Sequence, residues 1–239
     1  ARRSWADVFL VTSSDENLKN TKAYFYDLNF KGEYDLGKND QVALTAYYGR
    51  DVFCFADQFR FDWGNTAISG VWKHAYGEKV VSEIYATYSK YDYSVAGGDD
   101  FKVAAAIKNT SLNAKFDYFV SDKHTIKFGV NGMYYGLNPG MIEGQDLTSQ
   151  ALETEAGLEL SPYISDEFKV NSDLTVLYGL RYSTFMNFGP GTVRSYQEGQ
   201  PMIESTVTGV DTYEKGELAK FYSGLEPRLA VNYSLDSVS

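Results

Sequence analysis

Strict alternation of apolar and polar side chains constrains this chain more than any other feature of its sequence. Residues 24–34 read YFYDLNFKGEY, in which every second residue from Tyr24 to Tyr34 is apolar or aromatic, apart from Gly32. The positions between them carry mostly charged or polar residues: Phe25, Asp27, Asn29, Lys31 and Glu33. Since successive side chains of a β-strand point to opposite faces, this pattern predicts a strand with one apolar face. That face needs either a soluble core or the hydrocarbon of a membrane as its neighbour.

The same period of two recurs along the whole chain, and almost nothing follows the helical period of about 3.6. The pattern predicts ten strands, near residues 4–12, 22–34, 41–53, 63–76, 80–94, 103–119, 125–137, 154–170, 174–187 and 221–235. Several of them are much longer than the roughly 5–6 residues of an ordinary strand. A strand that crosses a bilayer at a tilt needs about 9–11 residues, so the excess length suits a membrane span.

The predicted connections alternate between short and long. Short links rich in turn-forming residues lie at 35–40, 77–79, 120–124 and 171–173, and longer links lie at 13–20, 54–62, 96–102, 138–153 and 188–220. Outer-membrane barrels have short periplasmic turns and longer extracellular loops, whereas a sandwich has no reason to sort its loops in this way. The expected fold is therefore all-β, an antiparallel transmembrane β-barrel.

Composition excludes several classes of function. No apolar run reaches the roughly 18 residues that a membrane-spanning helix needs. The net charge of -10 argues against nucleic acid as a partner, and the single cysteine, Cys54, excludes an internal disulfide. The chain has two histidines and lacks the common catalytic and nucleotide-binding motifs, so we expect neither an enzyme nor a cofactor. A weak hypothesis of loop-bound calcium concerns Gly97-Gly98-Asp99-Asp100, where a solvated loop is the more frequent explanation.

Six segments of the chain, taken in order, resemble a single family. They are KAYFYDLNFKGEYDLGKNDQVALTAYYGRDVF (22–53), WGNTAISGVWKH (63–74), IYATYSKYDY (84–93), TIKFGVNGMYYG (125–136), LYGLRYSTFMNFGPGT (177–192) and GLEPRLAVNY (224–233). With the succession YGLR, FGPGT and LEPR, they resemble the barrel of TonB-dependent outer-membrane receptors. The resemblance is strongest to the large barrels with which Gram-negative bacteria import glycans and other nutrients.

This resemblance implies a barrel of about 22 strands whose lumen is filled by a plug domain. Such a protein lies in the outer membrane of a Gram-negative bacterium and imports a scarce nutrient (a glycan, peptide, siderophore or cofactor). Its implied partners are membrane lipid, its own plug domain, the TonB complex and a surface lipoprotein. Residues 1–239 would then be one segment of the barrel domain, with the plug and the remaining strands absent from this chain.

The polar faces of such a barrel would line the lumen and contact the plug. The candidates for these contacts are Asp27, Lys31, Arg181, Glu226 and Arg228. Because an unpaired buried charge is costly, each should pair either with the plug or with a neighbour inside the barrel wall. The long link 188–220 should lie outside the cell and contact the substrate through Tyr196 and Tyr213. The side chains expected to face lipid from the strand at 22–34 are Tyr24, Tyr26, Leu28, Phe30 and Tyr34.

Two alternatives remain open at this point. Even-numbered barrels start at about 8 strands, so the chain could be a complete ten-stranded outer-membrane barrel that acts as a porin, an adhesin or a structural protein. It could also be a soluble, sugar-binding β-sandwich, although the strand lengths and the sorting of the loops disfavour this.

Overall fold

Long antiparallel strands make up most of the structure. The computed structural model describes residues 1–56, 58–97, 101–144 and 147–235, with side chains described outside residues 141–151. Nine long strands occupy this part of the chain: β2 (Lys22–Asp35), β3 (Asp40–Phe55), β4 (Phe59–Tyr76), β5 (Val80–Gly97), β6 (Phe101–Phe119), β7 (His124–Gly144), β9 (Glu155–Lys169), β10 (Leu174–Phe188) and β13 (Leu218–Tyr233). Each coincides with a predicted strand, which confirms nine of the ten.

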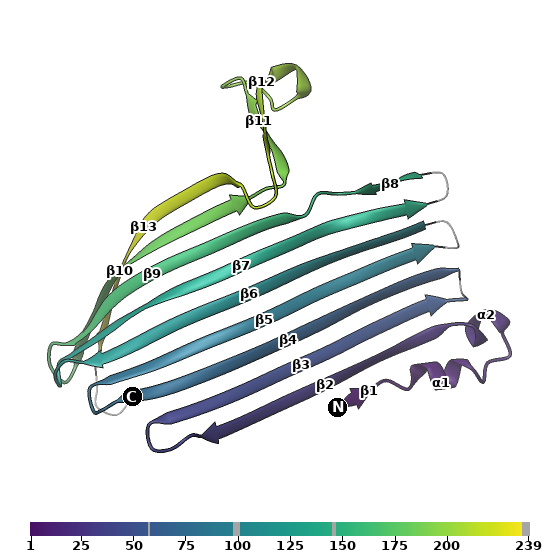
Figure 1. The fold of residues 1–239 in the computed structure, drawn as a ribbon. Helices are drawn as coiled ribbons and strands as arrows, with labels where there is room; N and C mark the ends of the chain where they lie inside the picture. The colour runs from purple at the N-terminus through teal and green to yellow at the C-terminus, as the bar shows by residue number, and fades with distance from the viewer. Residues whose placement is uncertain (57, 98–100, 145–146, 236–239) are drawn as a thin grey trace.

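These strands form a single layer. In the sheet they follow the order β2-β3-β4-β5-β6-β7-β9-β10-β13, with β1 (Arg2–Arg3) beside β2, and β8 (Leu147–Ala151) beside β7. Figure 1 shows a broad curved sheet with the long strands side by side. Within the described residues no second sheet packs against it, and Val52 and Cys54 are the buried hydrophobic side chains. The sandwich alternative is therefore wrong, because a sandwich buries one face of each sheet.

The predicted strand at 4–12 is wrong. A short helix, α1 (Ala6–Leu10), occupies this region, and a second one, α2 (Glu16–Lys19), follows it. Arg3 of β1 forms an ion pair of 2.8 Å with Asp7 of α1. So short a stretch of apolar residues cannot separate a period of two from the helical period. No helix in the described part of the chain is long and apolar enough to span a membrane.

The predicted long links are shorter than expected, because the strands continue into them. β3 and β4 run through most of 54–62, and β7 followed by β8 takes up most of 138–153. The link 188–220 holds a separate hairpin of β11 (Gly191–Tyr196) and β12 (Val207–Tyr213), with the 3-10 helix η1 (Glu204–Thr206) between them. Figure 1 shows this hairpin projecting from the sheet near the ends of β10 and β13. Backbone pairing continues where the alternation of side chains has already stopped.

The strand register divides the sheet into two faces of different character. Residues directly opposite each other in a ladder share a face, and Asp27 lies opposite Gly49 while Leu28 lies opposite Tyr48. One face, which we call the polar face, includes the side chains Asp27, Asn29, Lys31 and Glu33. The other, which we call the apolar face, includes Tyr24, Tyr26, Leu28, Phe30 and Tyr34. The ladder therefore groups the residues of 24–34 as the alternation predicted.

On the apolar face, an uncharged band lies between two rows of aromatic side chains. The row toward the long links, the outer girdle, includes Tyr26, Tyr48, Tyr88 and Tyr134. The row toward the short turns, the inner girdle, includes Tyr34, Trp72, Tyr76, Tyr118, Phe168 and Tyr178. Among the described residues of this face, Asp166 lies in the same row as Tyr118 and Tyr178 and accepts a hydrogen bond from the Tyr178 hydroxyl at 2.7 Å. No charged side chain of the described residues lies on this face from the row of Tyr34 and Trp72 to the row of Tyr88 and Tyr134. Such a band between aromatic girdles is typical of transmembrane barrels, and we call the stretches between the girdles the membrane-spanning segments.

The band is rich in large apolar side chains that the chain itself does not cover. Its exposed members include Leu28, Phe30, Leu44, Ile68, Leu112, Phe128, Leu160, Ile164, Leu180 and Leu229. Monomeric soluble proteins rarely expose a continuous apolar patch of this kind. The band therefore requires an apolar neighbour outside the described residues.

Replacing Leu112 with arginine tests the environment of this band. Leu112 is 60% exposed in the structure, so an arginine there would be nearly neutral in water. In lipid, we expect Leu112→Arg to lower the free energy of unfolding by about 2–4 kcal/mol, measured by denaturant titration of the full-length protein folded into vesicles. Asn113→Arg, on the polar face of the same strand, is the matched control and should have a much smaller effect. Equal effects of the two substitutions would contradict the assignment of the faces.

Candidate functional site

One row of the polar face carries charges of both signs across the sheet. Nine strands contribute one residue each, in the order Asp35, Gln41, Lys73, Glu83, Lys115, Gly129, Tyr163, Arg181 and Glu226. We call this row the polar belt. Facing side chains in a ladder have their Cβ atoms about 4.5–5.5 Å apart, so opposite charges there attract one another. The belt thus places complementary charges on strands that are far apart in the sequence.

Direct contacts join neighbouring members of the belt. Gln41 Nε2 donates a hydrogen bond to Asp35 Oδ1 at 3.1 Å, and Lys73 Nζ lies 3.1 Å from Glu83 Oε1. Glu83 also accepts a hydrogen bond from the hydroxyl of Tyr85. Part of the charge of the belt is therefore neutralised inside the sheet.

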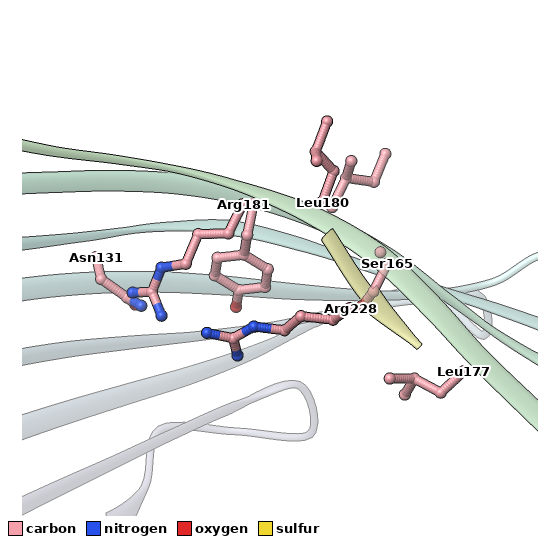
Figure 2. Close-up of a pocket in the computed structure, with 9 residues that line it drawn as sticks. Asn131, Ser165, Leu177, Leu180, Arg181 and Arg228 are labelled. Atoms are coloured by element: carbon pink, nitrogen blue, oxygen red, sulfur yellow. The ribbon is translucent and has the colours of Figure 1, made fainter. Parts of the chain in front are cut away.

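Around Arg181 the polar face holds a hollow of about 260 Å³. Its polar lining residues are Asn131, Tyr163, Ser165, Arg181 and Arg228. Figure 2 shows both guanidinium groups extending into the same space, with Leu180 on the other side of the ribbon. The hollow thus has two cationic side chains, Arg181 and Arg228, in its lining.

The hydrogen-bonding capacity of Arg181 is not fully satisfied by the described residues. Its Nε atom is buried and has no hydrogen-bond partner among them. The neighbouring carboxylate, Glu226, accepts hydrogen bonds from Ser183 Oγ at 2.6 Å and from Arg228 Nη2 at 3.2 Å. The carboxylate opposite Arg181 is thus bonded to Arg228, and two arginines beside one carboxylate leave a net positive charge beside the hollow. Because a donor sealed from water is costly without an acceptor, the hollow favours an anionic group.

A glycine makes room for the aromatic wall of this hollow. The side chain of Tyr163 lies over Gly129 of the adjacent strand, so a Cβ at Gly129 would lie 2.9 Å from the tyrosine hydroxyl. The same Cβ would also collide with the backbone carbonyl of Ala114. Only glycine fits at this position without a shift of the neighbouring strand.

The structure brings together three of the five side chains that the sequence predicted for the lumen. Arg181, Glu226 and Arg228 lie within the adjacent strands β10 and β13, and Arg181 faces Glu226 directly. Their proximity could not be deduced from sequence spacing, because the hairpin of β11 and β12 separates the two strands.

The other two predicted residues lie at the opposite end of the strand order, on β2. Asp27 is buried and its carboxylate lies 2.8 Å from Arg2 Nη2, while Lys31 Nζ lies 2.8 Å from Glu33 Oε1. Both therefore have partners inside the sheet. The five residues share the polar face but do not make one site.

The two tyrosines predicted to contact the substrate are also separated. Tyr196 is the last residue of β11, opposite Val207, and Tyr213 is the last residue of β12, opposite Gly191 at the other end of the hairpin. By strand alternation their side chains belong to different faces of the hairpin. They cannot form a single aromatic platform.

Residues 98–100 of the proposed calcium loop lie outside the described residues. Elsewhere in the described part of the chain, no group of three or more His, Cys, Asp or Glu side chains is arranged to hold a metal ion. The calcium hypothesis stays a prediction.

Sequence reasoning missed Lys73, Glu83 and Lys115, because the residues that stand opposite one another here come from three different strands. The position of each short turn could have predicted part of the polar belt, because residues at equal distances from a turn lie opposite each other. Counting outward from the turn at 77–79 pairs Lys73 with Glu83, as the ladder does. Hairpin symmetry about each short turn is therefore enough to find part of the belt.

Comparison with known proteins identifies the fold. No family model and no curated protein matches the chain. Among solved structures, the hemophore receptor HasR of Serratia marcescens matches with a TM-score of 0.57 and 13% identity, over 90% of this chain and 35% of that one. The ferric-catecholate import receptor Fiu of E. coli K12 matches with a TM-score of 0.57 and 11% identity, over 91% and 45%. The copper transporter OprC matches with a TM-score of 0.50 and 9% identity, over 89% and 34%.

At these identities the matches show a shared fold. The chain spans less than half the length of each of these three proteins. Its sheet has the antiparallel β-barrel fold of these receptors and transporters, as an open portion whose described edge strands do not pair with each other.

Substitution of Gly129 tests the close packing beside the hollow. We expect Gly129→Ala to lower the free energy of unfolding by about 1–3 kcal/mol, because the added methyl group overpacks the site between Tyr163 and the adjacent backbone. Gly136→Ala is the control on the same strand, where the nearest atom to a Cβ would be 3.9 Å away. Denaturant unfolding of the refolded full-length protein measures both. Equal stability of the two variants would contradict the packing described here.

Proposed function

We propose that this chain is part of the barrel wall of a TonB-dependent transporter in the outer membrane of a Gram-negative bacterium. The protein would import a scarce nutrient through a plugged lumen. The polar belt is the observation that carries this proposal. A row with charges of both signs on one face, behind an uncharged band on the other, suits a wall between lipid and a filled, hydrated interior.

The fold shared with HasR, Fiu and OprC supports a role in uptake, since those proteins are described as receptors or transporters for heme with its hemophore, ferric catecholate and copper. The plug and the other strands of the barrel would belong to the rest of the same polypeptide. We assign the contact with the TonB complex to that part and propose a surface lipoprotein as an additional partner. The role proposed is binding and transport, without catalysis.

The hollow beside Arg181 is the best candidate for a contact with the plug. Its two guanidinium groups, including the unsatisfied Nε–H of Arg181, would donate hydrogen bonds to a carboxylate or to backbone carbonyls of the plug. Asp27 and Lys31 already have partners in the wall and would contribute to the plug contact less strongly. A plug held in this way blocks free diffusion until energy is supplied.

On the side of the long links, the hairpin of β11 and β12 is the candidate for substrate contact. It carries Tyr196 and Tyr213 as two separate stacking surfaces, suited to the flat faces of a sugar or a chelate. The substrate class proposed stays broad: a glycan, peptide, siderophore or cofactor.

Electrical conductance separates a plugged transporter from a porin. We expect the full-length protein in a planar phosphatidylcholine bilayer to be electrically silent, because the plug fills the lumen. Deletion of the plug domain should open channels of large conductance. Open channels in the full-length protein would support the porin alternative and contradict the proposal.

Substitution of Arg181 tests the plug contact itself. We expect Arg181→Gln to weaken plug docking by about 1.5–3 kcal/mol, the usual strength of hydrogen bonds to charged groups. The measured result would be more frequent channel opening in the bilayer and faster proteolysis of the plug. Lys127→Gln is the control, because Lys127 is satisfied within the wall by Glu167 at 2.7 Å. Identical behaviour of the two variants would exclude Arg181 as a plug contact.

A further inference from the structure

A second group of charges lies on the apolar face, beyond the outer girdle. It consists of four cations and two carboxylates, which leave a net charge of +2: Arg50, Arg60, Lys90, Lys108, Asp62 and Asp92. We call this group the outer cluster. The whole chain has a net charge of -10, so a positive surface is a local departure from its overall balance.

The position of the outer cluster relative to the girdle is set by the register. Arg50 and Lys90 each lie two residues beyond a girdle tyrosine of their own strand, Tyr48 and Tyr88 respectively. Lys108 lies directly opposite Lys90 on the next strand. Two residues of strand rise by about 6.8 Å, which is the distance from the edge of the hydrocarbon to the headgroups.

Arg50 is held in place by carboxylates of two other strands. Its guanidinium pairs with Asp62 on β4 and lies 3.3 Å from Asp92 Oδ2 on β5. It crosses β4 above Gly64, where a Cβ would lie 3.1 Å from its Nη1 atom. The position of the Arg50 guanidinium is therefore fixed by residues of β4 and β5.

Asp62 is the buried carboxylate that binds two arginines of the cluster, Arg50 and Arg60. It is buried and accepts hydrogen bonds from Arg60 Nε at 3.0 Å and from Ser94 Oγ at 2.9 Å. Burial by itself would raise the pKa of Asp62, but these hydrogen bonds and the charges of Arg50 and Arg60 hold its pKa below the ordinary value. The carboxylate thus stays ionised near neutral pH, and its contribution to stability is lost only as the pH falls below the usual range of an aspartate.

The positive charges of the facing lysines, Lys90 and Lys108, are compensated less completely than that of Arg50. Lys90 lies 2.8 Å from Asp92, which also serves Arg50. Lys108 is exposed and has no ion-pair partner among the described side chains. Like charges directly opposite each other in a ladder are destabilising, so an anion bound between Lys90 and Lys108 would relieve their repulsion.

We propose that the outer cluster binds the phosphate groups of a lipid headgroup in the leaflet on the side of the long links. The inference rests on the proposed function, because it requires the apolar band to lie in a membrane. One phosphate can accept hydrogen bonds from both facing lysines, and Arg50 presents a fixed guanidinium beside them. The lipid chains of the same molecule would lie on the apolar face between the girdles.

The double variant Lys90→Gln/Lys108→Gln tests this site without leaving a buried charge unpaired, because Asp92 keeps Arg50 as its partner. The probe is fluorescent diphosphoryl lipid A, titrated against the full-length protein in detergent. We expect the affinity to fall about fivefold for each lost cation, hence about 25-fold in total. The variant should also be at least as stable as the parent when lipid is absent, since it loses a repulsive pair.

Lys73→Gln/Lys115→Gln is the matched control, because it removes two cations from the polar face of β4 and β6. Its affinity for the probe should equal that of the parent protein. Dephosphorylated lipid A should bind the parent protein as weakly as diphosphoryl lipid A binds the double variant. Displacement of the probe by inorganic phosphate at the same concentration would overturn the lipid assignment in favour of a free anion.

A parallel test of membrane insertion separates the two proposals. Folding into phosphatidylcholine vesicles is measured by heat-modifiable migration in gels. A protein that inserts but binds the probe equally well in all variants would overturn this inference and leave the transporter proposal standing. A protein that fails to insert would overturn both.

Discussion

The need to pair every backbone amide and carbonyl is the constraint on which the rest of this structure depends. A surface that faces hydrocarbon offers no water to satisfy these groups, so the strands must satisfy one another. The ladder from β2 to β13 does so across nine long strands, with register shifts at Ala104/Ala106 and at Asn187/Phe188. Once the ladder is formed, it fixes which residues stand opposite each other. The polar belt and the outer cluster are both consequences of that register.

The two charged groups show how position along a strand decides the role of a charge. Lys115 lies on the polar face, where it takes part in the polar belt. Lys108 lies seven residues earlier on the same strand, on the other face, and is kept away from hydrocarbon because it lies beyond the outer girdle. Within the part of the chain that the structure describes, charged side chains are thus absent from the apolar face between the row of Tyr88 and Tyr134 and the row of Tyr34 and Trp72.

In some strands the alternation of apolar and polar residues is irregular, because one end of the strand extends beyond the apolar band. In β5, Lys90, Asp92 and Ser94 are on the apolar face, which breaks the pattern that Ile84, Ala86 and Tyr88 begin. The break marks the place where the strand leaves the band and enters water. Strands predicted from alternation therefore ended too early at this rim, and the links 54–62 and 138–153 were taken for loops although backbone pairing continues through them.

By itself, the sequence determined the nine long strands, the division of each into two faces, and the pairing about each short turn, such as Lys73 with Glu83. These features depend on alternation and turn residues, which are local. Only the tertiary structure decided that α1 replaces a strand, that Arg181 meets Glu226 across the projecting hairpin, and that Arg50 reaches Asp92 above Gly64. The first of these two contacts joins strands that are separated in the sequence by a hairpin, and the second crosses an intervening strand at a glycine. Both depend on the register of the assembled sheet, which the sequence of a single strand does not determine.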